Sequence, residues 1–203
     1  MTGPVVPAAS VPFGAALPGT VLALKEWAAA VHALLDGRQT VLLRKGGIHE
    51  KRFSVRGSRF VVFPTVAHSH AESTRAEHAD LLALGAADVA ERTVVVRAEL
   101  SVAATIAVRR PERIAELEPF HIWTTESVRR NRIDFRPRHE LTAIVVSVRP
   151  LAPPLTVPLV PDYAGCRSWV DLVEMPGSVA LGEQVHDDAG LLDVTVRVRN
   201  AVG

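Results

Sequence analysis

The sixteen-residue stretch Thr93–Val108 constrains the fold more than any other part of the chain. Every second residue in it is apolar, whereas the positions between them include Arg97, Glu99, Ser101 and Thr105. Side chains alternate between the two faces of a β-strand, so this period of two predicts a strand with one buried face. Sixteen residues exceed the usual length of a strand, and we therefore expect a bulge, a bend or a division into two strands.

Four shorter segments also predict strands: Thr40–Leu43, Phe60–Phe63, Leu141–Arg149 and Leu191–Arg199. The second and third stop at prolines, Pro64 and Pro150, which cannot donate a hydrogen bond to a ladder. The last shows strict alternation of apolar and polar residues. Residues 150–161 contain five prolines and predict an extended excursion.

The first predicted helix is Leu24–Leu35, which is alanine-rich, has apolar residues three and four apart, and contains no proline or glycine. A competing interpretation takes Asp36-Gly37 as a two-residue hairpin turn, which would pair a strand Ala30–Leu35 with Gln39–Arg44. A second helix is predicted over His70–Leu84. It would begin at the capping-box pattern of Ser69 and Glu72 and end at Gly85.

Two short helices are expected further along. One starts at Pro111 and reaches about Leu117, because proline suits the first helical position. The other covers Glu126–Arg132 behind Thr124 or Thr125. Strands and three to four helices do not alternate regularly, which predicts an α+β fold. We expect a single domain with a mixed, mostly antiparallel sheet that is strongly bent or barrel-like.

Composition places this domain within residues 21–203, behind a flexible Pro/Ala-rich leader at residues 1–20. The hydrophobic share of 48% suits a chain of 203 residues that buries its own core. Cys166 is the single cysteine, so no internal disulfide forms and a cytoplasmic location is expected. No apolar run approaches the length of a membrane span, so no membrane partner is expected.

The net charge of +1 conceals a strong asymmetry. The stretch 44–59 carries six Lys/Arg against Glu50, and 129–138 carries five Arg against Asp134. In contrast, Asp171–Asp193 has six acids and no Lys or Arg. The two basic stretches favour an anionic ligand, although solvated charged faces explain them as well.

The most suggestive local pattern lies between the predicted strands Thr40–Leu43 and Phe60–Phe63. Glycines there allow backbone N–H groups to approach a phosphate, with neighbouring cations completing the site. The pattern is not a Walker A loop, and a tight turn with solvated charges is the alternative. The candidate phosphate-binding or nucleic-acid-binding residues are Arg44, Lys45, Gly46, Gly47 and His49, together with Arg129, Arg130 and Arg132.

Metal binding is a weaker possibility. His68 and His70 would share a face only on a strand, and a third ligand would have to come from elsewhere, such as His121 or Glu72. No stretch shows the carboxylates and lysine of a metal-dependent nuclease in the required order. No cofactor is therefore predicted, and His68 and His70 are kept as weak metal candidates.

Two further groups have open roles. Cys166 is either a nucleophile, with His121 or His186 as base, or a buried small hydrophobe. Trp123 and Trp169 either stack on bases or anchor the core, and core anchoring is the better-supported interpretation.

Several of these stretches together resemble DUF1802, a bacterial family of uncharacterised proteins. The resemblance spans roughly residues 22–175 and rests on Leu24-Lys25-Glu26-Trp27, Leu42-Leu43-Arg44-Lys45-Gly46-Gly47-Ile48, Phe63-Pro64-Thr65, His121-Ile122-Trp123-Thr124 and Tyr163-Ala164-Gly165-Cys166-Arg167-Ser168-Trp169. The family has no settled function and assigns no catalytic residue. Its link to restriction–modification contexts favours a nucleic-acid role.

The sequence therefore predicts binding of a phosphate-bearing ligand, nucleic acid above all, through stretches 44–59 and 129–138. One alternative is a metal-dependent nuclease or small phosphohydrolase, which leaves enzyme activity open. Another is a protein-interaction module that uses the acidic C-terminal segment. The oligomeric state is also open. The deciding structural question is whether Arg44, Lys45 and the arginines of 129–138 meet on one concave surface.

Overall fold

The computed structural model describes residues 10–12, 20–46, 52–165, 167–173 and 178–203. Its main sheet has six strands in the order β3-β6-β5-β4-β2-β7. Their bounds are β2 Thr20–Trp27, β3 Val41–Lys45, β4 Arg59–Thr65, β5 Thr93–Ala107, β6 Leu141–Pro158 and β7 Trp169–Val173. Only β2 and β4 pair in parallel, and the other neighbours are antiparallel. A separate two-stranded ladder joins β1, Ser10–Pro12, to β8, Ser178–Ala180.

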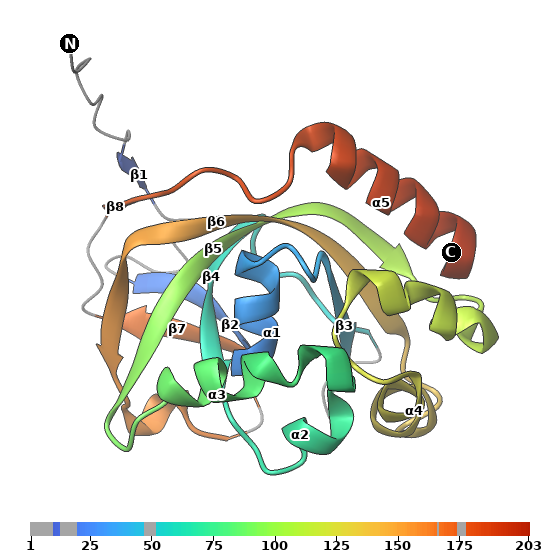
Figure 1. The fold of residues 1–203 in the computed structure, drawn as a ribbon, viewed down its shortest axis with the longest axis horizontal. Coiled ribbons are helices and arrows are strands. Elements are labelled where there is room, and N and C mark those ends of the chain that lie inside the picture. Colours follow the sequence, from blue (N-terminus) through green and yellow to red (C-terminus); the bar gives the residue numbers. More distant parts are fainter. Residues whose placement is uncertain (1–9, 13–19, 47–51, 166, 174–177) are drawn as a thin grey trace.

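This architecture confirms the predicted α+β class with a mixed, mostly antiparallel sheet. Strands β3 and β7 form the two ends of the sheet and do not pair with each other in the described chain, so the sheet is not a closed barrel. In Figure 1 the long ribbons of β5 and β6 arch over helix α1, which lies inside the curve of the sheet. No helix in the described residues is long and apolar enough to cross a membrane.

The predicted irregularity of the Thr93–Val108 stretch is confirmed. Strand β5 runs for 15 residues, and its register with β6 shifts between Val96 and Ala98 and again between Val102 and Ala104. At the first shift β6 has three more residues than β5, and at the second β5 has one more than β6. Such irregularities increase the local bend and twist of a strand, and the two shifts help to give the sheet its curvature.

Strand β6 is longer than predicted, because it continues past Pro150 to Pro158. Proline is tolerated there because β3 pairs only with the first part of β6, Leu141–Val145. Pro153 and Pro154 lie in a register shift, where β6 has no partner residues in β5, so these prolines remove no bond from that ladder. The predicted extended excursion of residues 150–161 is thus largely a strand.

The helix predicted over Leu24–Leu35 is right only in its second part, α1 Ala28–Leu35. Leu24–Trp27 belongs to β2, where tertiary pairing with β4 and β7 overrides helical spacing. The hairpin alternative is wrong. Asp36 and Gly37 end α1 instead, and Gly37 takes a φ of +75°, as expected after a helix C-terminus.

The helix predicted over His70–Leu84 is divided into α2 His70–Ser73, the 3₁₀ turn η1 Ala76–His78, and α3 Asp80–Ala87. Thr74 interrupts it with an extended backbone and forms a bridge to Trp123. Gly85 lies inside α3 and does not end it. A Cβ at Gly85 would lie 2.6 Å from the backbone nitrogen of Ala29, so the glycine permits close packing of α3 on α1.

The segment after β5 contains the 3₁₀ helix η2 Pro111–Phe120, helix α4 Thr125–Val128 and the π-helix η3 Arg129–Asp134. Thr124 caps α4 as predicted, its hydroxyl oxygen accepting from the backbone N–H of Ser127 at 3.1 Å. A fourth short turn, η4, covers Pro161–Tyr163. The described helices are therefore shorter and more numerous than the three to four expected.

The strand predicted over Leu191–Arg199 is wrong, because this segment lies in helix α5, Asp188–Val202. The carboxylate of Asp187 accepts from the backbone N–H of Gly190 at 2.7 Å and caps the helix. The buried positions follow a helical period: Leu191, Thr195, Val198, Ala201 and Val202. Leu192 and Val196, which the alternating pattern placed in the core, are exposed.

Two layers of core lie on the two faces of the sheet. Along β2, Val21 and Ala23 contact one apolar cluster, whereas Leu22 and Leu24 contact the cluster that also holds Val31 of α1. Burial on both faces explains why β2 is a continuous apolar run rather than an alternating one. A third cluster joins α5, η2 and α1 to the edge of the sheet at β3.

Candidate functional site

Distant parts of the sequence meet at one end of the sheet. Strands β2 and β4 run in parallel and finish together, with Glu26 opposite Pro64 and Trp27 opposite Thr65. The hydroxyl of Thr65 donates to the backbone oxygen of Glu26 at 3.0 Å. Trp123 packs edge-on against Trp27. Three of the motifs that carry the resemblance to DUF1802 therefore lie within one small region.

The centre of this region is a buried ion pair between Glu26 and Arg44. The Glu26 side chain is fully buried, and Arg44 Nη1 lies 3.5 Å from its Oε2. Arg44 Nη2 also donates to the backbone oxygen of Lys25 at 2.7 Å, and the N–H of Trp27 donates to Glu26 Oε1 at 2.8 Å. Burial lowers the pKa of Arg44, and the charge of Glu26 opposes this shift. The Arg44 guanidinium is thus engaged inside the protein and does not face a ligand.

Lys45 links the two basic stretches through backbone contacts. Its ammonium donates to the carbonyl oxygens of Arg132, Ile133 (3.1 Å) and Phe135 (2.7 Å). An ammonium has three N–H donors, so all three are used at the C-terminal end of η3. Burial lowers the pKa of Lys45, and Asp134 opposes the shift. Lys45 holds η3 against β3 and adds its positive charge to the surface beside it.

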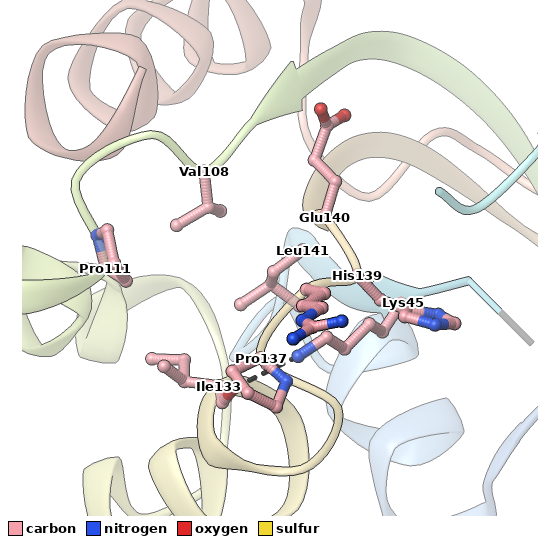
Figure 2. Close-up of a pocket in the computed structure, with 9 residues that line it drawn as sticks. Lys45, Val108, Pro111, Ile133, Pro137, His139, Glu140 and Leu141 are labelled. Atoms are coloured by element: carbon pink, nitrogen blue, oxygen red, sulfur yellow. Dashed lines mark hydrogen bonds between the residues drawn. The ribbon is translucent and has the colours of Figure 1, made fainter. Parts of the chain in front are cut away.

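A concave surface lies beside Lys45, with a cavity volume of about 220 Å³. Figure 2 shows Lys45 directed toward Ile133, whereas the carboxylate of Glu140 points away from the ammonium. We call this surface the basic hollow; its walls are Lys45, Val108, Pro111, Ile133, Pro137, Arg138, His139, Glu140 and Leu141. Lys45 from the first basic stretch and Arg138 from the second therefore meet on one concave surface, whereas Arg44 does not reach it.

The remaining predicted residues of the second stretch lie around η3. Arg129 is exposed and donates to the backbone oxygen of Glu112 at 3.0 Å, next to the hollow wall at Pro111. Arg130 is exposed and lies 3.8 Å from Glu126. Arg132 is half-buried, and its guanidinium lies over the ring of Trp123.

Of the first stretch, Gly46 is buried directly after β3, whereas Gly47 and His49 lie outside the described residues. The glycines with positive φ in the described chain are Gly37 and Gly165, so Gly46 does not form a left-handed turn. The described residues therefore do not support the phosphate nest that was predicted around Gly46 and Gly47.

Next to η3 lies an aromatic cluster of Trp27, His70 and Trp123. The His70 and Trp27 rings stack at a centroid distance of 3.8 Å and an interplanar angle of 18°. Trp123 meets Trp27 edge-on at 6.1 Å, and the Arg132 guanidinium lies 5.5 Å from the Trp123 ring centroid. Such a distance allows a cation–π contact. A cavity of about 10 Å³, the size of one water molecule, lies between Trp27, Trp123, Ser127, Val128, Asn131 and Arg132.

The charges around this cluster act on one another. Burial lowers the pKa of His70, Glu26 opposes the shift and Arg132 adds to it. Burial lowers the pKa of Arg132 to about 10, with Glu26 opposing and Arg44 reinforcing the shift. At neutral pH, therefore, Arg132 is charged and His70 is a neutral ring.

Several buried polar groups beside the cluster have no hydrogen-bond partner among the described residues. They are both ring nitrogens of His121, the indole N–H of Trp123 and the hydroxyl of Ser73. Burial first, then Arg75 and Arg132, lower the pKa of His121 to about 3; the backbone at Trp123 and at His121 itself opposes the shift only in part. Buried polar groups are normally satisfied, so this grouping marks an unusual part of the core.

The metal candidates do not come together. His68 is exposed, whereas His70 is buried in the stack with Trp27. His78 contacts the guanidinium of Arg75. In the described chain no group of three His, Cys, Asp or Glu side chains is placed to hold a metal ion. Cys166 lies outside the described residues.

Three acids of the C-terminal segment have partners within the described chain. Asp171 on β7 pairs with Arg56 at 3.3 Å, Asp187 caps α5, and Asp193 lies 3.6 Å from Arg197. Trp169 anchors the core as favoured, since its indole N–H donates to the backbone oxygen of Ser54 and its ring meets Phe60 edge-on at 4.9 Å.

Sequence analysis did not single out Glu26 as part of a site. Its carboxylate lay in a segment predicted as helix, with no charge pattern around it. The available signal was the Glu26-Trp27 pair within the first DUF1802-like motif, because an acid beside a tryptophan at the end of an apolar run is unusual for a solvated face.

Comparison with known proteins gives a family and a distant structural likeness. The sequence model of the family "Domain of unknown function (DUF1802)" matches residues 23–195. No curated protein matches the chain. Among solved structures, the crystal structure of a mutant of the ZmASCH protein from Zymomonas mobilis is similar, with 12% identity and a TM-score of 0.41. That likeness covers 86% of this chain and 94% of the other.

Proposed function

Because the chain belongs to the DUF1802 family, a domain of unknown function, its role must be inferred from the site, and we propose that it binds a phosphate-bearing ligand, nucleic acid in particular. The observation that carries this proposal is the basic hollow, where Lys45 and Arg138 from two separate basic stretches line one cavity of about 220 Å³. Two cationic stretches that meet on a concave surface raise the local concentration of anions.

The hollow combines charge with an apolar wall. Arg138 lines the hollow together with the acid Glu140, and Arg129 lies beside it; both arginines are exposed and without a salt bridge to an acid of the described chain. Val108, Pro111, Ile133 and Leu141 supply the apolar wall. A phosphodiester chain presents both anionic oxygens and apolar sugar faces, so this lining suits it. Lys45 would attract an anionic ligand through its positive charge and not through a hydrogen bond, because its three N–H donors are bound to backbone oxygens.

A binding assay with labelled single-stranded and duplex oligonucleotides over a range of salt concentrations tests the proposal. Arg129→Ala/Arg138→Ala should weaken binding. For two lost single-strand phosphate contacts, the slope of log affinity against log salt should fall by about 1.4, because fewer counterions are released. The matched control is Arg92→Ala/Arg167→Ala. It removes the same charge from two exposed arginines that precede β5 and β7, away from the β3 edge.

Two results contradict the proposal. If the unmodified protein binds no oligonucleotide at low salt, the function is wrong. If both double variants weaken binding equally, only net charge matters and the hollow is no site. A cytoplasmic location, expected from the single cysteine, belongs to the same proposal and is checked by cell fractionation.

A further inference from the structure

The imidazole of His70 lies in the position that a bound heteroaromatic ring would take. It stacks almost parallel to Trp27 at 3.8 Å, and it is buried although its neighbours Val66, Ala67, His68 and Ser69 are exposed. An exposed segment thus places one flat ring on a tryptophan face. Base–aromatic stacking in proteins that bind single strands has the same geometry.

Besides its stack on Trp27, the side chain of His70 has one hydrogen bond in the described chain, whereas its backbone is held by bonds to Ala67 at 3.0 Å and from Thr74 at 3.1 Å. Its Nδ1 accepts from the backbone N–H of Ala67 at 3.3 Å, which is a long hydrogen bond. Helix α2 has four residues, and Thr74 ends it with an extended backbone. A helix this short has little stability of its own, so displacing His70 from Trp27 disrupts few backbone contacts.

The space beyond the stack contains polar groups without partners. The indole N–H of Trp123 has no hydrogen-bond partner among the described residues, although the side chain is only 1% exposed. Trp123 also lines the water-sized cavity, together with Asn131 and Arg132. The corner between Trp27 and Trp123 is therefore lined by two tryptophans together with Asn131 and Arg132, and the indole N–H of Trp123 is left without a partner among the described residues.

We propose that this corner is a nucleobase slot, that the His70 ring fills it in the unbound protein, and that an unpaired base of a single strand displaces the ring. The inference rests on the proposed function, because the strand that delivers the base would be held in the basic hollow across η3. The two surfaces share η3: Ile133 faces the hollow, whereas Asn131 and Arg132 line the cavity at Trp123.

The chemistry of the slot favours a neutral heterocycle. Burial lowers the pKa of His70, so the ring that fills the slot at neutral pH is itself uncharged. The nearby cations Arg44 and Arg132 are opposed by the buried carboxylate of Glu26. An uncharged base with hydrogen-bonding edges suits this surrounding, whereas a cationic ring would be repelled by Arg132.

The test uses His70→Asn, because the asparagine oxygen keeps an acceptor for the Ala67 N–H while the stacking ring is removed. Binding is measured for an oligonucleotide and for an abasic strand of equal length. The variant should bind the base-containing strand at least about fivefold more tightly, because the histidine ring no longer occupies the slot. Its affinity for the abasic strand should not change. Trp27→Ala should lose most of the difference between the two strands. His68→Ala, an exposed neighbour, should change neither affinity.

Each outcome has a distinct meaning. Unchanged or weaker binding of the base-containing strand by a folded His70→Asn protein overturns the slot. If both strands bind equally well to the unmodified protein and depend on Arg138, the proposed function stands and the slot is wrong. Binding of free adenosine or uridine by His70→Asn, measured as tryptophan fluorescence quenching, supports the slot even if no oligonucleotide binds. If His70→Asn does not fold, the same nucleoside titration is carried out with the unmodified protein and with Trp27→Ala. Fluorescence quenching that is equal in these two proteins, or absent from both, overturns the slot.

Discussion

Among single residues, Arg44 is the one whose loss should cost the fold most. It is the cation nearest the fully buried carboxylate of Glu26, at 3.5 Å. Removing one partner of a buried ion pair leaves an uncompensated charge, so Arg44→Met should lower the free energy of unfolding by about 3–5 kcal/mol. Urea unfolding measures this change.

The matched comparison is Arg38→Met. Arg38 pairs with Asp36 at 2.7 Å and Asp80 at 2.9 Å, but all three side chains are about a third to a half exposed. Exposed pairs contribute little, so the loss should stay below about 1 kcal/mol. Equal losses from both variants would mean that Arg44 acts on stability as an ordinary surface arginine. That result would make Arg44 a candidate for ligand binding again.

The second residue-scale prediction concerns His121 and pH. Its pKa falls to about 3 in the folded protein from an ordinary value of 6.5, because of burial and the charges of Arg75 and Arg132. Between these values the unfolded chain binds a proton that the folded protein does not, so stability decreases as pH falls. The slope is about 1.4 kcal/mol per pH unit, or about 2 kcal/mol between pH 7 and pH 5.

His121→Leu should remove that slope. The leucine also replaces two buried ring nitrogens that make no well-formed hydrogen bond within the described residues. Urea unfolding at pH 7, 6 and 5 compares the two proteins. The lowered pKa of His70 leaves a smaller dependence of the same sign in the variant. A variant whose stability falls as steeply as that of the unmodified protein would show that His121 titrates normally.

At the scale of elements, α5 offers a direct test of helix against strand. The alternating pattern puts Val196 and Val198 on the same face, whereas in the helix Val196 is 45% exposed and Val198 is fully buried. Val198→Ala should destabilise the protein by more than about 1 kcal/mol by leaving a cavity. Val196→Ala should be neutral or slightly stabilising, because alanine is the better helix former. Thermal unfolding of both variants decides, and equal losses would favour the strand.

Helix α3 also shows that a local sequence pattern can fit two different structures. Gly85 resembles a helix terminator in the sequence, yet it lies within α3 because α1 approaches too closely for a side chain. A glycine can thus mark either the end of an element or a close contact. Only the position of the neighbouring element distinguishes the two.

For the whole molecule, the first residues should contribute little stability. Deleting residues 2–19 removes β1, whose ladder with β8 has three residue pairs. Isolated two-stranded ladders are marginal in water, so the loss should be about 1 kcal/mol and the Tm should fall by no more than about 4 °C. The control deletion, residues 188–203, removes α5 with its buried Leu191, Val198 and Val202, and should abolish soluble folding. A large loss from the first deletion would place residues 2–19 in the core.

Local sequence patterns were sufficient to predict those features that depend on residues close together in the chain. The period of two in Thr93–Val108 predicted a strand, and its length predicted an irregularity, which the two register shifts confirm. The pair Thr124-Thr125 predicted a helix start, and the structure shows Thr124 as the residue whose hydroxyl caps three residues ahead. The α+β class and the mostly antiparallel sheet followed from the order of such segments. These properties depend on neighbours in sequence, where spacing alone decides which groups meet.

Tertiary structure decided the properties that depend on neighbours in space. The sequence of Leu191–Val198 fits both a strand and a helix pattern. The helix forms because it lets Val198, Ala201 and Val202 pack against a shared apolar cluster. Arg44 and Lys45 are adjacent cations in the sequence, yet one is buried against Glu26 while the other binds the carbonyls of η3. Likewise, nothing local predicts that the ring of His70 stacks on Trp27. Charge and aromaticity are visible in a sequence, but burial and partners are set only when β2, β3, α2 and η3 come together.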